Sequence, residues 1–120
     1  MSSAHIIKLR GGWKRLTDSG SEPFNLPCPS AQLASLGPSL TLVRRFQHPP
    51  RHSPHQVARL FASHMEDTTH VELDGQPISA QALQQGHRLS DQSHQLTITI
   101  QTENLTTQDD WGHVWISIEP

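Results

Sequence analysis

The sequence is poor in cysteine, in charged residues and in long apolar runs, and each shortage excludes a class of protein. Cys28 is the single cysteine among 120 residues, which excludes an internal disulfide and cysteine-rich zinc folds. Charged residues make up 17% and the formal net charge is −2, so no strong field points to nucleic acid or to an anionic membrane. No apolar run approaches the ~18 residues that span a bilayer, so we expect no membrane segment.

The start of the chain and its overall size lead to further expectations. Residues 1–5 show no basic region before an apolar stretch, so we expect no secretory signal and a cytoplasmic location. Leu, Ile, Val and Phe together number 27 of 120 residues, just above the ~20% below which disorder is common. We therefore expect one domain, residues 1–120, with a lean hydrophobic core.

Alternation of apolar and polar residues predicts strands. Residues 96–102 read Leu-Thr-Ile-Thr-Ile-Gln-Thr, and residues 114–118 read Val-Trp-Ile-Ser-Ile. Each pattern places one apolar face against a core, as a half-buried antiparallel strand requires. Weaker strand patterns cover residues 5–10, 40–47 and 57–62, and the last is apolar on both sides, which predicts burial between two layers.

Turn and helix signals complete the prediction. Asp74-Gly75 follows Val71 and Leu73 and is a strong type I′ hairpin dipeptide. Ser79–Gln85 contains helix formers with a possible stop at Gly86, and 32–36 allows one further turn. Short strands separated by such turns predict an all-β antiparallel sandwich with at most one or two short helical turns.

Several segments together resemble a known family. They are Gly12-Trp13, Val43–Phe46, Val57–Phe61, the hairpin Val71–Ile78 and the strand Leu96–Ile100. This order is similar to the N-terminal sugar-binding domain of glycoside hydrolase family 2, the β-galactosidase and β-glucuronidase group. The resemblance covers about residues 12–101. Asp74 stands where the family usually has Asn in the hairpin, and His94 where an Asn often precedes the later strand.

The resemblance implies a galactose-binding-like jelly roll without catalytic activity. The family's chemistry lies in a separate β/α barrel that carries two glutamates, and 120 residues leave no room for that barrel. The chain is therefore expected to be an accessory module and not an enzyme.

The stretch 104–115 offers the best candidate binding residues. Sugars are held by an aromatic face packed on the ring, with carboxylate, amide, Arg or His groups on the hydroxyls. Trp111 beside Asp109, Asp110 and His113 supplies both kinds of group, and Trp115 lies on the outer face of its strand. Two alternatives stay open: Trp111 as a core residue, and Trp115 as part of a sheet cover or an interface.

Metal sites have less support. His48, His52 and His55 have a spacing that can ligate Zn²⁺ or Cu²⁺, but the prolines between them extend the loop and spread the rings. No His-x-His pair of the cupin type occurs. Asp109-Asp110 with backbone carbonyls is a lesser candidate for a structural Ca²⁺. We expect no metal and no cofactor.

Single residues outside these clusters have plainer interpretations. Trp13 is expected in the core, and Cys28 as a partly buried thiol with no reason for a lowered pKa. Arg44 and Arg45 point to opposite faces of one strand, so one of them faces inward and needs a carboxylate partner or lines a cleft.

Three functions remain in order of preference. The first is a non-catalytic module that binds a carbohydrate or a protein partner. The second is a scaffold or accessory subunit of a glycoside hydrolase-like enzyme, with a homo-oligomer left open. The third is a small metal-dependent jelly-roll enzyme. An exposed Trp111 with a concave rim would favour the first, and a flat apolar patch around Trp115 the second.

Overall fold

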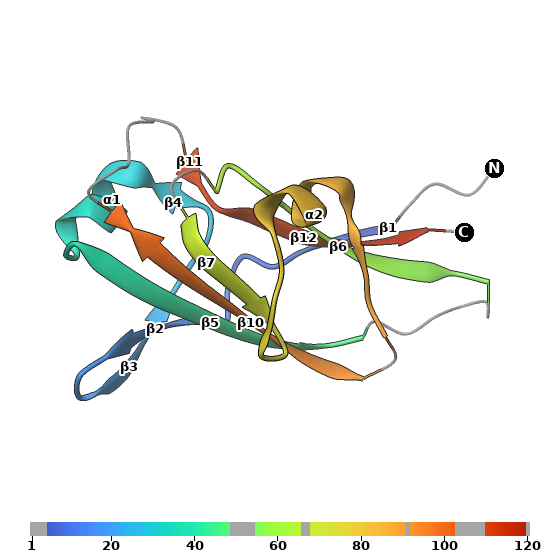
Figure 1. The fold of residues 1–120 in the computed structure, drawn as a ribbon, viewed down its shortest axis with the longest axis horizontal. Coiled ribbons are helices and arrows are strands. Elements are labelled where there is room, and N and C mark those ends of the chain that lie inside the picture. Colours follow the sequence, from blue (N-terminus) through green and yellow to red (C-terminus); the bar gives the residue numbers. More distant parts are fainter. Residues whose placement is uncertain (1–4, 49–54, 66–67, 91, 103–109, 120) are drawn as a thin grey trace.

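The computed structural model describes residues 5–48, 55–65, 68–90, 92–102 and 110–119 (Figure 1). Its elements are, in chain order, β1 (His5–Lys8), β2 (Trp13–Thr17), β3 (Gly20–Phe24), β4 (Cys28–Pro29), α1 (Ser30–Ser35), β5 (Ser39–Gln47), β6 (Val57–Ser63), β7 (Thr68–Leu73), β8 (Gln76–Pro77), α2 (Ala80–Gln85), β9 (His87–Arg88), β10 (Ser93–Gln101), β11 (Asp110–Trp111) and β12 (His113–Glu119). Within these ranges no helix combines the length and the apolar character that crossing a bilayer requires.

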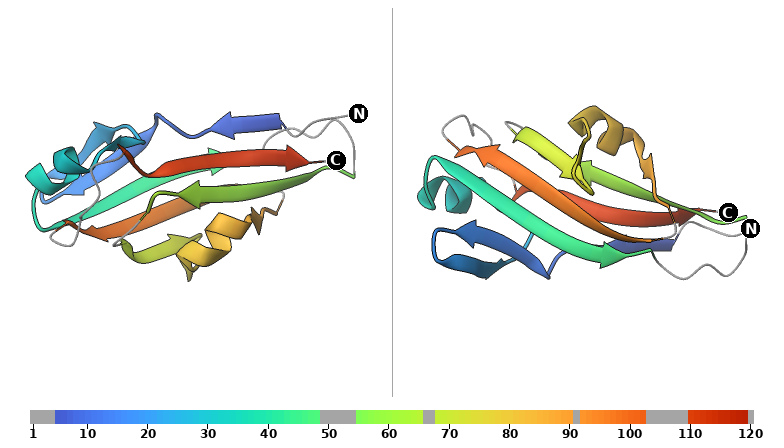
Figure 2. Two further views of the ribbon diagram at one scale, coloured as in Figure 1. Left: turned by 90° about the horizontal axis from the view of Figure 1, so that it is seen from above. Right: turned by 60° about the horizontal axis from the view of Figure 1, so that its bottom comes forward.

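Two antiparallel sheets form the body of the molecule. One sheet has the strand order β1-β12-β6-β9 and the other β3-β2-β5-β10-β7-β8, while β11 and β4 pair in a short separate ribbon. Figure 2 shows β12 and β6 in one layer and β5 and β10 in the other. The predicted all-β antiparallel sandwich with two short helices is confirmed.

The two strands with regular alternation form as predicted. In β10 the side chains of Leu96, Ile98 and Ile100 are fully buried, and the strand pairs with β5 on one side and β7 on the other. In β12 the residues Val114 and Ile116 face the core in the same way. The opposite face of β12 consequently points out of the sandwich.

The hairpin and the second helix also match the prediction. Asp74 and Gly75 both have positive φ, 55° and 80°, as a type I′ turn requires. The Ser79 side chain accepts a hydrogen bond from the Ala82 backbone N–H at 3.0 Å and caps α2, which ends at Gly86. Local sequence therefore sets these two boundaries.

Strand β6 is less buried than its sequence suggests. Ala58, Leu60 and Ala62 face the core, but Val57 and Phe61 on the other face are half-buried. The expectation of burial on both sides is therefore corrected. Helix α2 packs against β6, with Gly86 at its end beside the Phe61 ring.

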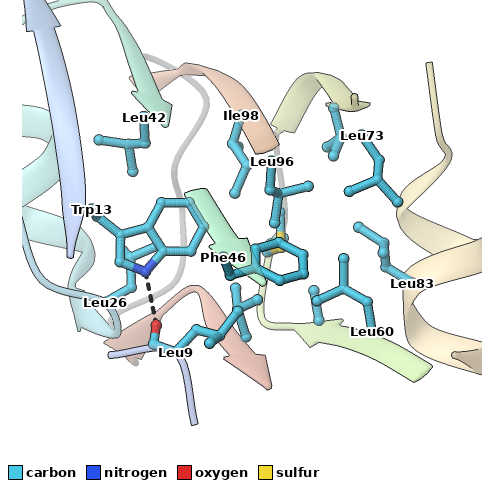
Figure 3. Close-up of a cluster of buried hydrophobic side chains, with 14 of the residues drawn as sticks. Leu9, Trp13, Leu26, Leu42, Phe46, Leu60, Leu73, Leu83, Leu96 and Ile98 are labelled. Carbon is cyan, nitrogen blue, oxygen red and sulfur yellow. Dashed lines mark hydrogen bonds between the residues drawn. The ribbon is translucent and has the colours of Figure 1, made fainter. Parts of the chain in front are cut away.

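The core lies between the sheets and is closed at one side by α2 (Figure 3). Leu83 of α2 enters the same cluster as Leu60 and Leu73. Trp13 is 1% exposed, and its Nε1 donates a hydrogen bond to the Leu9 carbonyl oxygen at 2.7 Å. The prediction of Trp13 as a core residue is confirmed, and this bond satisfies the one polar atom of the indole.

Arg44 is the arginine that faces inward on β5. It lies on the same strand face as the buried Leu42 and Phe46, whereas Arg45 is exposed and donates from Nε to the Gln95 side chain at 3.0 Å. The Arg44 Nη1 donates to the Arg45 carbonyl oxygen, and its Nε is buried without a hydrogen-bond partner. A Cβ on Gly12 would lie 3.0 Å from the Arg44 guanidinium, so glycine makes room for this side chain.

Candidate functional site

Trp111 lies in the core and not on the surface. The side chain is 0% exposed, and β11 pairs Trp111 with Cys28 of β4. The following Gly112 has φ 85° and packs against Leu26, which turns the chain from this ribbon into β12. The expectation that Trp111 stacks on a sugar is corrected, because a fully buried ring presents no face to a ligand.

Asp110, the residue before Trp111, lies on the exposed side of the ribbon. Asp110 is exposed and opposes Pro29 across the ribbon, while Asp109 lies outside the described residues. The Ca²⁺ hypothesis for this pair therefore stays a prediction. Burial, with a smaller contribution from the Asp110 charge, raises the pKa of the Cys28 thiol to about 11. A thiol held in its protonated form is a poor nucleophile, in agreement with the expectation for Cys28.

The outer face of β12 carries the other two predicted residues into one groove. His113 and Trp115 are half-buried and point away from the core. Across the sheet Trp115 opposes Lys8 of β1 and Phe61 of β6. The groove has a volume of about 870 Å³, within the usual range of small-ligand sites. We call it the Trp115 groove.

Residues from four parts of the chain form the walls of the Trp115 groove. They come from β1 and the residue two positions after it, from the segment before β4, and from the end of β6 with the start of β12. The lining residues are Ile6, Lys8, Arg10, Asn25, Leu26, Pro27, Ser63, His64, His113, Val114 and Trp115. Apolar surface from Trp115 and Ile6 thus lies beside side chains that can donate or accept hydrogen bonds.

The indole of Trp115 is held by a parallel stack. Its ring centroid lies 5.5 Å from that of Phe61, with an interplanar angle of 4°. Phe61 is itself held by the end of α2, because a Cβ built on Gly86 would lie 2.6 Å from its Cζ. The helix therefore positions the aromatic pair without entering the groove lining.

Two histidines lie together at the end of β6. The rings of His64 and His113 meet edge to face at a centroid distance of 4.7 Å. His64 has φ 57°, its carbonyl oxygen accepts from the Gly112 N–H at 2.8 Å, and its Nδ1 lies 2.9 Å from the Ser63 Oγ. These contacts fix the orientation of both rings toward the groove wall.

The described residues do not gather into a metal site. No group of three or more His, Cys, Asp or Glu side chains within the described ranges could hold a metal ion. Of the three loop histidines, His52 lies outside those ranges, so the interpretation of the His48, His52 and His55 loop stays a prediction.

Asp74 and His94, which stand where the resembled family has Asn, contact each other outside the groove. His94 is buried, and its Nδ1 lies 2.6 Å from Asp74 Oδ2 and its Nε2 3.0 Å from the Ser90 carbonyl oxygen. The Gln95 backbone N–H donates to Asp74 Oδ1 at 2.8 Å. Burial acts to raise the pKa of Asp74, but the hydrogen bonds from His94 and Gln95 and the His94 charge together lower it. The pair joins the hairpin to β10.

Sequence patterns identified His113 and Trp115 but missed most of the groove. The sequence patterns did not single out four other lining residues, because these lie in segments far from β12 in the chain. They are Lys8, Arg10, Asn25 and His64. One signal was present: residues 6, 8 and 10 alternate with Ile7 and Leu9, which places Ile6 and the two cations on one face of a strand.

Comparison with known proteins supports the fold. No family model matches this chain, and no curated protein matches it. A solved structure, an FMN-binding beta-glucuronidase from Facaelibacterium prausnitzii L2-6, superposes with a TM-score of 0.62 at 16% sequence identity. The match covers 98% of this chain but only 23% of that protein. The described chain is thus an antiparallel β-sandwich with the fold of one part of a larger glycoside-cleaving enzyme.

Proposed function

We propose that this chain is a non-catalytic, galactose-binding-like module that binds a carbohydrate in the Trp115 groove. The fold likeness to a part of a beta-glucuronidase supports a carbohydrate-related role. Since one fold serves many functions, the proposal depends on the groove and not on the likeness alone.

The observation that carries the proposal is the composition of the groove around Trp115. A half-buried indole lies in a concavity with an amide from Asn25, a hydroxyl from Ser63 and the two imidazoles. The C–H face of a sugar ring packs on an aromatic plane, and its hydroxyls need donors and acceptors around the rim. Because Phe61 already holds the indole in place, binding requires little ordering of the aromatic side chain.

A binding role is favoured over hydrolysis by the charges in the groove. Glycoside hydrolysis commonly uses two carboxyl groups about 5–9.5 Å apart on either side of the bond that breaks. No Asp or Glu is among the described residues that line the Trp115 groove. This composition supports a module that holds its ligand and leaves it unchanged.

The test is a binding titration of mono- and oligosaccharides against the wild-type protein and Trp115→Ala. We expect a saturable change in tryptophan fluorescence in the wild type, because Trp13 and Trp111 are buried and Trp115 is the half-exposed indole. Calorimetry should show that Trp115→Ala weakens binding about tenfold or more, which corresponds to ~1.4 kcal/mol.

Two further variants make this result interpretable. Leu16→Ala removes an apolar side chain that is 48% exposed on β2, away from the groove lining, and should bind as the wild type does. Asn25→Ala removes a rim amide without touching the aromatic stack and should also weaken binding. Equal affinity in Trp115→Ala and the wild type would place the ligand elsewhere and overturn the proposal.

A second candidate function, protein docking, is favoured by Ile6. This side chain is 53% exposed, and it lies on β1, an edge strand of the four-stranded sheet and one wall of the groove. An exposed apolar residue on an unpaired edge is a common feature of association surfaces. A scaffold or accessory subunit would use this edge.

Sedimentation velocity over a range of protein concentrations separates the two functions. Self-association through β1 would raise the sedimentation coefficient with concentration, and Ile6→Lys would abolish that rise. A sedimentation coefficient that does not change with protein concentration would remove self-association from consideration.

A further inference from the structure

The Trp115 groove differs in charge from the rest of the chain. The whole sequence has 9 Lys and Arg residues against 11 Asp and Glu residues. The groove lining contains Lys8 and Arg10 and, among the described residues, no carboxylate. A chain of net charge −2 thus has a local cationic surface where its candidate ligand would lie.

Among the residues that the structure describes, no side chain neutralises the two groove cations. On other described surfaces, Arg15 pairs with Glu22 at 2.6 Å and Arg59 with Glu119 at 3.9 Å. Neither Lys8 nor Arg10 forms an ion pair with any residue that the structure describes. Their positive charges are therefore available to a ligand.

The strand register places one of these charges next to the aromatic ring. Lys8 of β1 lies directly opposite Trp115 of β12, so their Cβ atoms are about 4.5–5.5 Å apart on one sheet face. Arg10 follows two residues later at the same groove wall. A sugar ring packed on the indole would hold a substituent within reach of the Lys8 ammonium, and Arg10 could bind an anionic group through two N–H donors.

We propose that the Trp115 groove selects saccharides that carry an anionic group, a ring carboxylate or a sulfate. This inference rests on the carbohydrate-binding role proposed above and specifies its ligand class. The ring packs on Trp115, the anion lies between Lys8 and Arg10, and Asn25 and the histidines bind hydroxyls.

The experiment compares two glycosides that differ in one group. Methyl β-D-glucuronide has a carboxylate where methyl β-D-glucoside has a hydroxymethyl group, and the 6-sulfate of the glucoside serves as a third probe. We expect the glucuronide to bind at least tenfold more tightly than the glucoside by calorimetry at low salt. The ratio should fall as ionic strength increases, because the Debye length shrinks from about 30 Å at 0.01 M to about 10 Å at 0.1 M salt.

Charge-removal variants assign the preference to the groove. Lys8→Gln and Arg10→Gln should each weaken glucuronide binding several-fold more than they weaken binding of the neutral glucoside. Lys14→Gln on β2 removes one positive charge outside the groove lining and is the matched control. A preference lost equally in Lys14→Gln would assign it to net charge and overturn the inference.

The remaining outcomes distinguish the inference from the proposed function. Equal binding of glucuronide and glucoside at a site that Trp115→Ala abolishes would overturn the anionic preference and keep the carbohydrate module. Binding of none of the three probes, with no change in Trp115 fluorescence, would count against both. If the glucuronide alone binds tightly, the groove selects the carboxylate group. If the glucoside 6-sulfate also binds tightly, the groove selects negative charge in general.

Discussion

At the scale of single residues, the contact of Asp74 with His94 is the clearest departure from the family pattern. Each residue stands where the family often has Asn, and in the structure the two side chains contact each other at 2.6 Å. The Asp74 carboxylate also accepts the Gln95 backbone N–H, and His94 packs against Phe46 with ring centroids 5.4 Å apart. The pair therefore joins the β7–β8 hairpin to the start of β10.

Stability should fall in acid through this carboxylate. The folded protein holds the pKa of Asp74 below its ordinary value of 3.8, so the ionised form stabilises the fold above that value. The contribution is lost as the pH falls from about 4 through the lowered folded pKa. Urea unfolding between pH 5 and pH 2 should show a steeper loss for the wild type than for Asp74→Asn. If the unfolding free energies of the two proteins fall in parallel as the pH decreases, Asp74 does not contribute to the loss of stability in acid.

At the scale of elements, α2 has a structural role that its six residues alone do not suggest. It is too short to be stable by itself, so its formation depends on the Ser79 cap and on packing. Leu83 enters the core, and Gly86 ends the helix against the Phe61 ring. The helix thus connects the core of the sandwich to the aromatic pair at the Trp115 groove.

Gly86→Ala should destabilise the protein and disturb Trp115. The φ of 97° is strained for any L side chain, and the new Cβ would meet Phe61. We expect a loss of about 1–3 kcal/mol in the free energy of unfolding, together with a change in Trp115 emission. Gly75→Ala is the control, because it has φ 80° in open space. Equal losses in both variants would show that the Phe61 contact is unimportant.

At the scale of the whole molecule, stability comes from the layer between the two sheets. β10 lies between β5 and β7, and its inward side chains Leu96, Ile98 and Ile100 have no exposed surface. The pairing of β1 with β12 joins residues near the two ends of the sequence, from His5 opposite Ile118 to Lys8 opposite Trp115. Figure 2 shows these two strands side by side.

Two isoleucines, Ile98 buried in β10 and Ile6 exposed on β1, test this distribution of stability. Ile98→Ala should cost about 2–5 kcal/mol in unfolding free energy, because the side chain is 0% exposed and its removal leaves a cavity. Ile6→Ala should change it by less than about 0.5 kcal/mol, since Ile6 is 53% exposed. Chemical denaturation measures both values. Similar costs would mean that β1 is as well packed as β10.

The sequence predicted the elements better than it predicted the site. The strands at residues 96–102 and 114–118, the Asp74-Gly75 turn and the short helix that ends at Gly86 all formed as expected. Of the candidate binding residues, His113 and Trp115 lie in the Trp115 groove, Trp111 is in the core and Asp110 is outside the groove. The roles of His113, Trp115 and Asp110 in ligand binding stay predictions.

Local sequence by itself determined where strands, turn and caps occur, because these depend on the side-chain period and on residues within a few positions of one another. Only the tertiary structure decided that β1 lies beside β12, that Trp111 turns inward at Gly112, and that Lys8 faces Trp115. These contacts join residues far apart in the chain, and no local preference encodes which strands become neighbours. The Trp115 groove exists because the pairing of β1 with β12 brings Lys8 and Trp115 onto one face of the sheet.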